Sequence, residues 1–193
     1  MMTMTHGLRG DAERWLLSYY RHSEIDGALF FGRLAKVIRD PRIQSDLTSH
    51  FADESQHARW WTDCMDELGV KPMRVTSSYQ DAYLEAGGAP ANVMEVLAVT
   101  LAFEKRVAGI YASHTKAHDL AAPIRSTLGK IMKDEGWHIQ WVSKALEQME
   151  AQYGADEVAA AIKRYSDADR EVYARSLAEH DVVVKSLAHF KAA

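Results

Sequence analysis

Two stretches of the sequence share the pattern Asp-Glu-x-x-His-x-x-Trp, which sets a carboxylate and an imidazole three residues apart. The first runs from Asp53 to Trp60 and the second from Asp134 to Trp141. A further glutamate lies about thirty residues before the glutamate of each pattern, Glu24 for the first and Glu104 for the second. The candidate metal ligands are therefore Glu24, Glu54, His57, Glu104, Glu135 and His138. Four glutamates and two histidines in this order are typical of a carboxylate-bridged dinuclear metal site inside a four-helix bundle.

The spacing within each pattern suits metal binding because positions i and i+3 share one face of a helix. A glutamate and a histidine so placed can converge on one ion, and the glutamate can also bridge to a second ion. Carboxylates mixed with imidazole favour iron or manganese. A structural zinc site would favour cysteine ligands and one ion, but Cys64 is the single cysteine of the chain. The sequence therefore predicts two iron ions, and it leaves Mn/Fe and Mn/Mn pairs open because these share the same ligands.

An aspartate precedes the glutamate in both patterns, Asp53 in the first and Asp134 in the second. A metal-bound histidine usually donates its other ring N–H to a carboxylate or a carbonyl group. We therefore expect Asp53 to hold His138 and Asp134 to hold His57, each across the bundle. The alternative is that both aspartates are simply exposed to solvent.

The periodicity of the apolar residues predicts five long helices that position these side chains. They cover residues 11–39, 43–68, 91–118, a segment that ends near 154, and 155–187. Asp40-Pro41 and Gly69 end the first two helices. The long connection over residues 70–90 contains several helix breakers and a short predicted helix at residues 77–85.

The candidate carboxylates lie level with one another in the predicted hairpins. Glu24 and Glu54 are almost equally far from the turn between their helices, roughly 20 Å along the axis. Glu104 and Glu135 are likewise almost equally far from theirs. Charge at such a depth is unfavourable unless metal ions neutralise it.

Two short turns and one long connection predict an all-α fold, a four-helix bundle of two antiparallel hairpins joined by a long crossover. On this interpretation, residues 1–10 form a flexible N-terminus and residues 11–154 form the bundle. Residues 155–193 form a fifth, C-terminal helix that packs on the bundle or makes a contact in an oligomer. One extended coiled coil fits poorly because the helix breakers are too regularly placed.

The bulk composition fits one soluble domain of 193 residues. The net charge of −4 favours neither nucleic acid nor an anionic membrane surface as a partner. No apolar run reaches the length of a membrane span, and residues 1–10 contain no secretion signal. Together with the single cysteine, these features favour a cytoplasmic protein.

With these patterns, the chain resembles the ferritin-like superfamily of diiron carboxylate proteins, and most of all its rubrerythrin-type branch. The likeness covers residues 11–149, and the six candidate ligands match the ligand order of that family one for one. It implies that Glu24 and Glu104 are terminal ligands, while Glu54 and Glu135 bridge the two ions. The aspartate before each Glu-x-x-His also resembles the bacterial multicomponent monooxygenases and the small subunits of ribonucleotide reductases.

The chain departs from these families at several points. Rubrerythrins carry a four-cysteine rubredoxin domain, which a chain with one cysteine cannot form. They also carry an extra glutamate at the position of Val107, so a peroxidase is disfavoured. Ferritins have a tyrosine seven residues after the first ligand, where this chain has Phe31; the equivalent position after Glu104 is Tyr111. Tyr111 is thus a catalytic candidate with a radical or hydrogen-bonding role, and a core tyrosine is the alternative.

Other residues with chemical potential lack this symmetry. Six further histidines are expected at the surface or in structural roles: His22, His50, His114, His118, His180 and His189. Trp60 and Trp141 are expected to fill the core or to relay oxidising equivalents. Gly27 and Ala28, one turn after Glu24, are expected to allow close helix packing or to leave room for a substrate.

We expect an enzyme in which reduced iron activates dioxygen or peroxide toward a small organic substrate, as an oxidase or oxygenase. The electrons would come from an external donor, because the chain has no flavin, Rossmann or cysteine-rich motif. Two alternatives stay open, a ferroxidase that handles iron and a scaffold whose metal is mainly structural. A homodimer is compatible with the sequence. The fold alone does not name the substrate.

Overall fold

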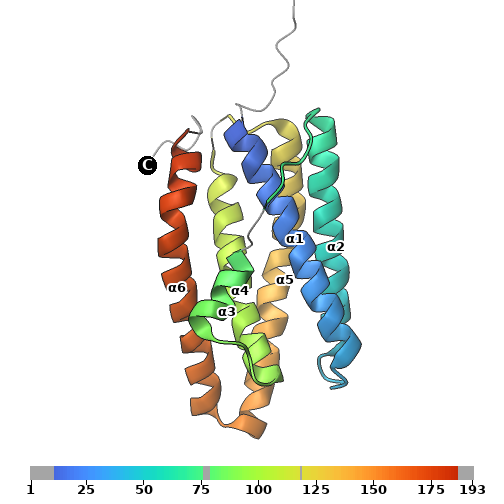
Figure 1. Ribbon diagram of the computed structural model, residues 1–193. Helices are drawn as coiled ribbons and strands as arrows, with labels where there is room; N and C mark the ends of the chain where they lie inside the picture. Colours follow the sequence, from blue (N-terminus) through green and yellow to red (C-terminus); the bar gives the residue numbers. More distant parts are fainter. Residues whose placement is uncertain (1–10, 76–78, 118, 187–193) are drawn as a thin grey trace, which may run out of the picture.

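The computed structural model describes residues 11–75, 79–117 and 119–186, and the backbone there is helical apart from the connections. The helices are α1 (Asp11–Val37), α2 (Gln44–Glu67), α3 (Tyr79–Gly87), α4 (Val93–His114), α5 (Ala122–Tyr153) and α6 (Ala155–Ser186) (Figure 1). No β-strand occurs within these described ranges. The prediction of an all-α bundle is confirmed, whereas the predicted flexible N-terminus, residues 1–10, lies outside the described residues.

The long helices α1 and α2 form one antiparallel hairpin, and α4 and α5 form a second (Figure 1). The two hairpins pack on each other through α2 and α5. The connection between α2 and α4 runs back along the bundle and carries α3 (Figure 1). The chain therefore crosses over once between the hairpins, so that helices from both contribute side chains to the same interior.

The helix ends follow local signals. The side chain of Asn92 accepts a hydrogen bond from the N–H of Glu95 at 3.0 Å, and the Glu95 carboxylate accepts one from the N–H of Ala91 at 2.7 Å. These two bonds, which resemble a capping box, fix the start of α4. Gly154, with φ of 91°, ends α5 in a conformation that favours glycine. Helix α4 ends at His114, earlier than the predicted residue 118, because the N–H groups of Lys116 and Ala117 bond only three residues back and form a turn.

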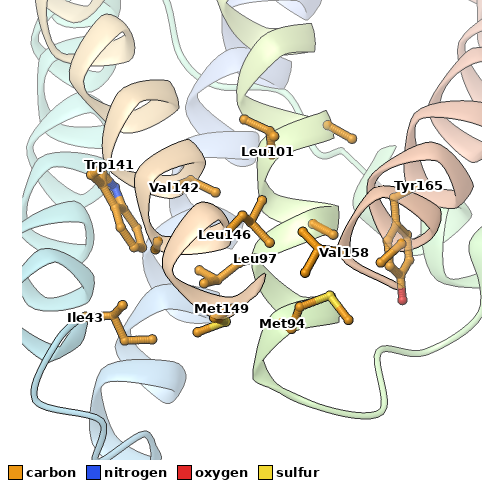
Figure 2. Packing of buried hydrophobic residues seen from close by; sticks show 14 of the residues in the cluster. Ile43, Met94, Leu97, Leu101, Trp141, Val142, Leu146, Met149, Val158 and Tyr165 are labelled. Carbon is orange, nitrogen blue, oxygen red and sulfur yellow. The ribbon is translucent and has the colours of Figure 1, made fainter. Parts of the chain in front are cut away.

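Two clusters of buried hydrophobic side chains form the core. One cluster lies towards the α1–α2 turn, and Figure 2 shows it between α4, α5 and α6. Its labelled members are Ile43, Met94, Leu97, Leu101, Trp141, Val142, Leu146, Met149, Val158 and Tyr165. The second cluster joins the start of α1 to the end of α2 and the start of α5. Burial of each large apolar side chain stabilises the fold by about 1.5–3 kcal/mol, so these two clusters hold the helices on either side of the layer between them.

Helix α6 packs against α4, α5 and α3 and adds a fifth long helix to the bundle (Figure 1). The guanidinium group of Arg106 on α4 lies 2.5 Å from Oδ2 of Asp169 on α6 and 3.8 Å from the ring centroid of Tyr173. This half-buried ion pair and the cation–π contact fix the two helices to each other. Within the described part of the chain, no helix combines the length and apolar character needed to cross a membrane.

Candidate metal centre

The six predicted ligands meet in the layer between the two hydrophobic clusters. They are Glu24 of α1, Glu54 and His57 of α2, Glu104 of α4, and Glu135 and His138 of α5. Each is at most 6% exposed, although all are charged or polar. Burial of this many polar groups in one layer is unfavourable unless they are paired with one another or with cations.

The ligand atoms fall into two groups that share one carboxylate. The groups are Glu24, Glu54 and His57, and His50, Glu54, Glu104 and His138. Within each group the atoms lie within 4.8 Å of one another. Glu135 lies between the two predicted histidines, with one carboxylate oxygen 3.9 Å from Nδ1 of His57 and the other 4.0 Å from Nδ1 of His138. One carboxylate shared by the two groups, with a second between the two histidines, is compatible with a pair of bridged ions.

The two predicted histidines each turn one ring nitrogen to this centre and the other to an aspartate. Nε2 of His57 lies 3.2 Å from Oδ2 of Asp134, and Nε2 of His138 lies 3.4 Å from Oδ2 of Asp53. An ionised carboxylate only accepts, so in the neutral rings Nε2 carries the hydrogen and Nδ1 keeps its lone pair. Both Nδ1 atoms are buried without a hydrogen bond to another described residue, and the nearest carboxylate oxygens are Oε2 of Glu24, 3.4 Å from His57, and Oε2 of Glu104, 3.5 Å from His138. Both aspartates are about one-third exposed, and each contacts the histidine to which the sequence assigned it.

The buried carboxylates repel one another in the absence of cations. Burial raises the pKa of Glu54 and Glu135 well above the usual 4.5, and the neighbouring carboxylates raise it further. Burial also acts to raise the pKa of Glu104, but the nearby His50 and His138 outweigh it and lower that pKa overall. Cations in the centre would stabilise the charged form of every carboxylate. Four carboxylates and two imidazole lone pairs therefore suit two hard metal ions.

His50 of α2 belongs to the same layer, although the repeated pattern does not include it. The sequence left open a surface position or a structural role for His50, and the surface position is wrong. Its ring is completely buried and stacks between Phe31 and His138, with a centroid distance of 3.7 Å to each ring. One signal in the sequence pointed here, because His50 lies four residues before Glu54 and so shares its helix face.

Hydrogen bonds fix the tautomer of His50. Its Nδ1 lies 3.1 Å from Nε1 of Trp141, and because an indole N–H can only donate, Nδ1 accepts. The hydrogen of the neutral ring is therefore on Nε2, which lies 3.2 Å from Oε1 of Glu54 and 3.3 Å from Oε1 of Glu104. Burial lowers the pKa of His50, in agreement with a neutral ring. His50 thus donates to two carboxylates and holds them in place, and in this tautomer it has no lone pair to offer an ion.

Tyr111 of α4 is fully buried beside the centre. Its hydroxyl donates a hydrogen bond to Glu24 and accepts one from the indole N–H of Trp61 at 3.3 Å. Burial, and then the charge of Glu24, raise the pKa of Tyr111 well above the usual 10. The side chain is therefore a neutral phenol that orients Glu24, which is the hydrogen-bonding geometry that the sequence left open for it.

Gly27 allows a ligand of α2 to pack directly on α1. A Cβ atom at this position would lie 2.4 Å from Oε2 of Glu54, which is closer than any stable contact. The small residue therefore serves the close approach of the carboxylate. Gly27 also lines a cavity of about 420 Å³ that extends from Glu54 and Glu104 to the surface beside α3.

Comparisons of the chain with protein-family models, with curated proteins and with solved structures found no match. By its fold and its centre, the described part of the protein is an all-helical bundle with buried histidines and glutamates that can hold metal.

Proposed function

We propose that the centre holds two iron ions and that the protein is a ferritin-like diiron oxidoreductase acting on a small organic substrate with dioxygen or peroxide. The inward-facing Nδ1 atoms of His57 and His138 carry this proposal. Buried polar atoms are nearly always hydrogen-bonded, yet these two have no such bond with another described residue. A buried imidazole with an inward lone pair and an outward carboxylate is the usual setting of a metal ligand.

In the proposed centre, one glutamate and one histidine would hold each ion, and two further glutamates would be shared between the ions. The terminal pairs are Glu24 with His57 and Glu104 with His138, and the bridges are Glu54 and Glu135. The membership of Glu54 in both ligand groups and the place of Glu135 between the histidines support these assignments. Mn/Fe and Mn/Mn pairs have the same ligand preferences and stay open.

The surrounding residues of the chain position this centre and shield it. His50 donates to Glu54 and Glu104, and Tyr111 donates to Glu24. The hydrophobic clusters exclude water from both sides of the layer. Iron bound by these residues would supply the redox equivalents for the reaction with dioxygen or peroxide, and an external donor would restore them.

The cavity favours an organic substrate over iron as the substrate. Its walls include Phe31, Val99 and Phe103, and such apolar side chains offer nothing to a hydrated metal ion. A ferroxidase is the second candidate, because the same centre would oxidise ferrous iron. A storage function would require a hollow multi-subunit shell, which analytical ultracentrifugation would detect.

The metal content of protein produced in iron-replete medium tests the proposal. We expect about two iron ions per chain, and a near-ultraviolet absorption band that disappears on anaerobic reduction and returns with oxygen. Folded protein that has met no chelator and contains zinc, or no metal, would refute it.

Matched variants test the ligand assignment. Glu54→Ala and Glu135→Ala are expected to lose metal, whereas Glu147→Ala changes an exposed glutamate of α5 and is expected to keep it. Two metal ions per chain in either ligand variant would show that the bridging assignment is wrong.

A further inference from the structure

The cavity beside the centre has an inner end and an outer end of different character. Its inner end is formed by Glu54 and Glu104, which are 6% and 2% exposed. Its outer end includes Leu29 and Leu84, which are 53% and 47% exposed. These two leucines are exposed large apolar side chains of the described part of the chain, so the opening of the cavity presents apolar surface.

The helices place the two ends a definite distance apart. Gly27 packs on Glu54 and so marks the level of the centre on α1. Arg33 also lines the cavity, six residues further on, which is about 9 Å along the helix axis. Helix α4 runs in the opposite direction, so Val99, five residues before Glu104, lies on the same side of the centre (Figure 1). The cavity therefore extends from the centre towards α3 along both helices.

The walls between the two ends are apolar and largely aromatic. They are formed by Phe30, Phe31, Val75, Tyr83, Val99 and Phe103. The hydroxyl of Thr100, which also lines the cavity, donates to the carbonyl of Val96 at 2.9 Å within its own helix. A volume of about 420 Å³ suits a small organic molecule, and these walls would bury its apolar body.

Arg33 is the only lysine or arginine among the described residues that line the cavity. It lies at the exposed outer end, and it makes no hydrogen bond or ion pair with another described residue. His22 and Asp26 also line the cavity, before Gly27 along α1, and they are already paired, since Nε2 of His22 lies 3.2 Å from Oδ2 of Asp26. An acid group of a bound molecule would therefore find its counter-charge at the opening, where a guanidinium group can bind a carboxylate.

We propose that the cavity binds a small organic acid with an apolar, preferably aromatic, body. The apolar end points inward to Glu54 and Glu104, and the acid group stays at the opening against Arg33. The role of this molecule as the substrate rests on the proposed function, whereas its binding does not.

Two fluorescent probes with the same ring system test the proposal, phenylnaphthylamine and its acidic counterpart anilinonaphthalene sulfonate. Both are titrated into the full-length protein, once chelated and once metal-loaded. Val99→Trp fills the cavity, and Val37→Trp adds the same bulk at a position that is 67% exposed and outside the cavity. Arg33→Gln removes the charge at the opening, and Arg39→Gln removes an exposed charge that does not line the cavity.

We expect both probes to bind the wild-type protein with one site, and Val99→Trp to weaken both at least tenfold, while Val37→Trp leaves them unchanged. Arg33→Gln is expected to weaken the sulfonate up to about fivefold at low salt and to leave the neutral probe unchanged. Leu29→Glu, at the exposed rim, serves if Val99→Trp does not fold, and it should weaken the sulfonate more than the neutral probe.

Unchanged binding in Val99→Trp would place the probes elsewhere and overturn the proposal. Equal effects of Arg33→Gln on the two probes, or none, would overturn the assignment of the acid group. Metal content is measured on the same samples. If the proposed function is wrong, the protein contains no iron but still binds the probes. If the present proposal is wrong, the protein contains two iron ions but binds no probe in the cavity.

Discussion

Gly27→Ala is the smallest change that should separate metal binding from folding. The added methyl group would lie 2.4 Å from Oε2 of Glu54, whereas ordinary contact begins at 3.4 Å, so the carboxylate must move by about 1 Å. The side chain of Glu54 can rotate away, because the contact involves its flexible end and not the backbone. We therefore expect the helices to keep their packing while the bridging carboxylate leaves its place.

The two consequences have opposite signs. Alanine in the interior of a helix is favoured over glycine by about 0.5–1 kcal/mol. Without metal, the free energy of unfolding of the variant should therefore be close to that of wild type or higher. Displacement of a bridging ligand should weaken metal binding by about 100-fold, the upper end of the loss seen when an outer hydrogen-bond partner is removed. At a saturating metal concentration this removes about 3 kcal/mol of metal-dependent stabilisation. For a chain of this length the metal-induced rise in Tm should shrink by roughly 5–10 °C.

Thermal unfolding followed by circular dichroism, with chelator and with manganese(II), measures both quantities. Gly109→Ala is the matched control, because it makes the same substitution on the exposed side of α4, where a Cβ would meet nothing within 4 Å. We expect Gly109→Ala to gain stability equally with and without metal. A Gly27→Ala protein with the full metal-induced shift would refute the reasoning, since Glu54 could then not be a ligand in the position described.

Three further predictions concern the surroundings of the centre. Asp53→Asn and Asp134→Asn remove the charge behind each histidine. Each is expected to weaken metal binding about 10- to 100-fold in a chelator competition assay. Unchanged affinity would show that the aspartates do not support the metal-binding histidines. His50→Leu should destabilise the metal-loaded protein by about 1.5–3 kcal/mol in denaturant unfolding, because two buried carboxylates lose their donor. Wild-type stability would contradict the donor role. In metal-free protein the raised pKa values of Glu54 and Glu135 mean that the folded state keeps protons that the unfolded state has lost. Their contribution is complete below the unfolded value of 4.5 and is lost as pH rises through the raised values. The Tm should therefore fall with rising pH once the pH is above the range in which His50 titrates in the unfolded chain, which is centred on 6.5. Added metal should abolish this fall, and a Tm that rises over the same range would contradict the stated pKa shifts.

Much of the helical framework and the six candidate ligands could be predicted from the sequence, because both follow from local spacing. Residues three or four apart share a helix face, so Glu54 with His57 and Glu135 with His138 are paired without reference to the rest of the chain. The distance of each ligand from its turn then sets its depth in the bundle. This is why the contact of Asp134 with His57, across two hairpins, could be expected before the fold was known.

The tertiary structure decided what depends on the rotation and the closeness of neighbouring helices. His50 became part of the centre only because Trp141 and Phe31, on two other helices, present a donor and a ring face to it. The need for glycine at position 27 arises because Oε2 of Glu54 lies 2.4 Å from the point where a Cβ atom would stand. Spacing along one chain gives the face of a helix but not the side chains that meet it, so the cavity and its exposed Arg33 appear only when α1, α3 and α4 are packed together.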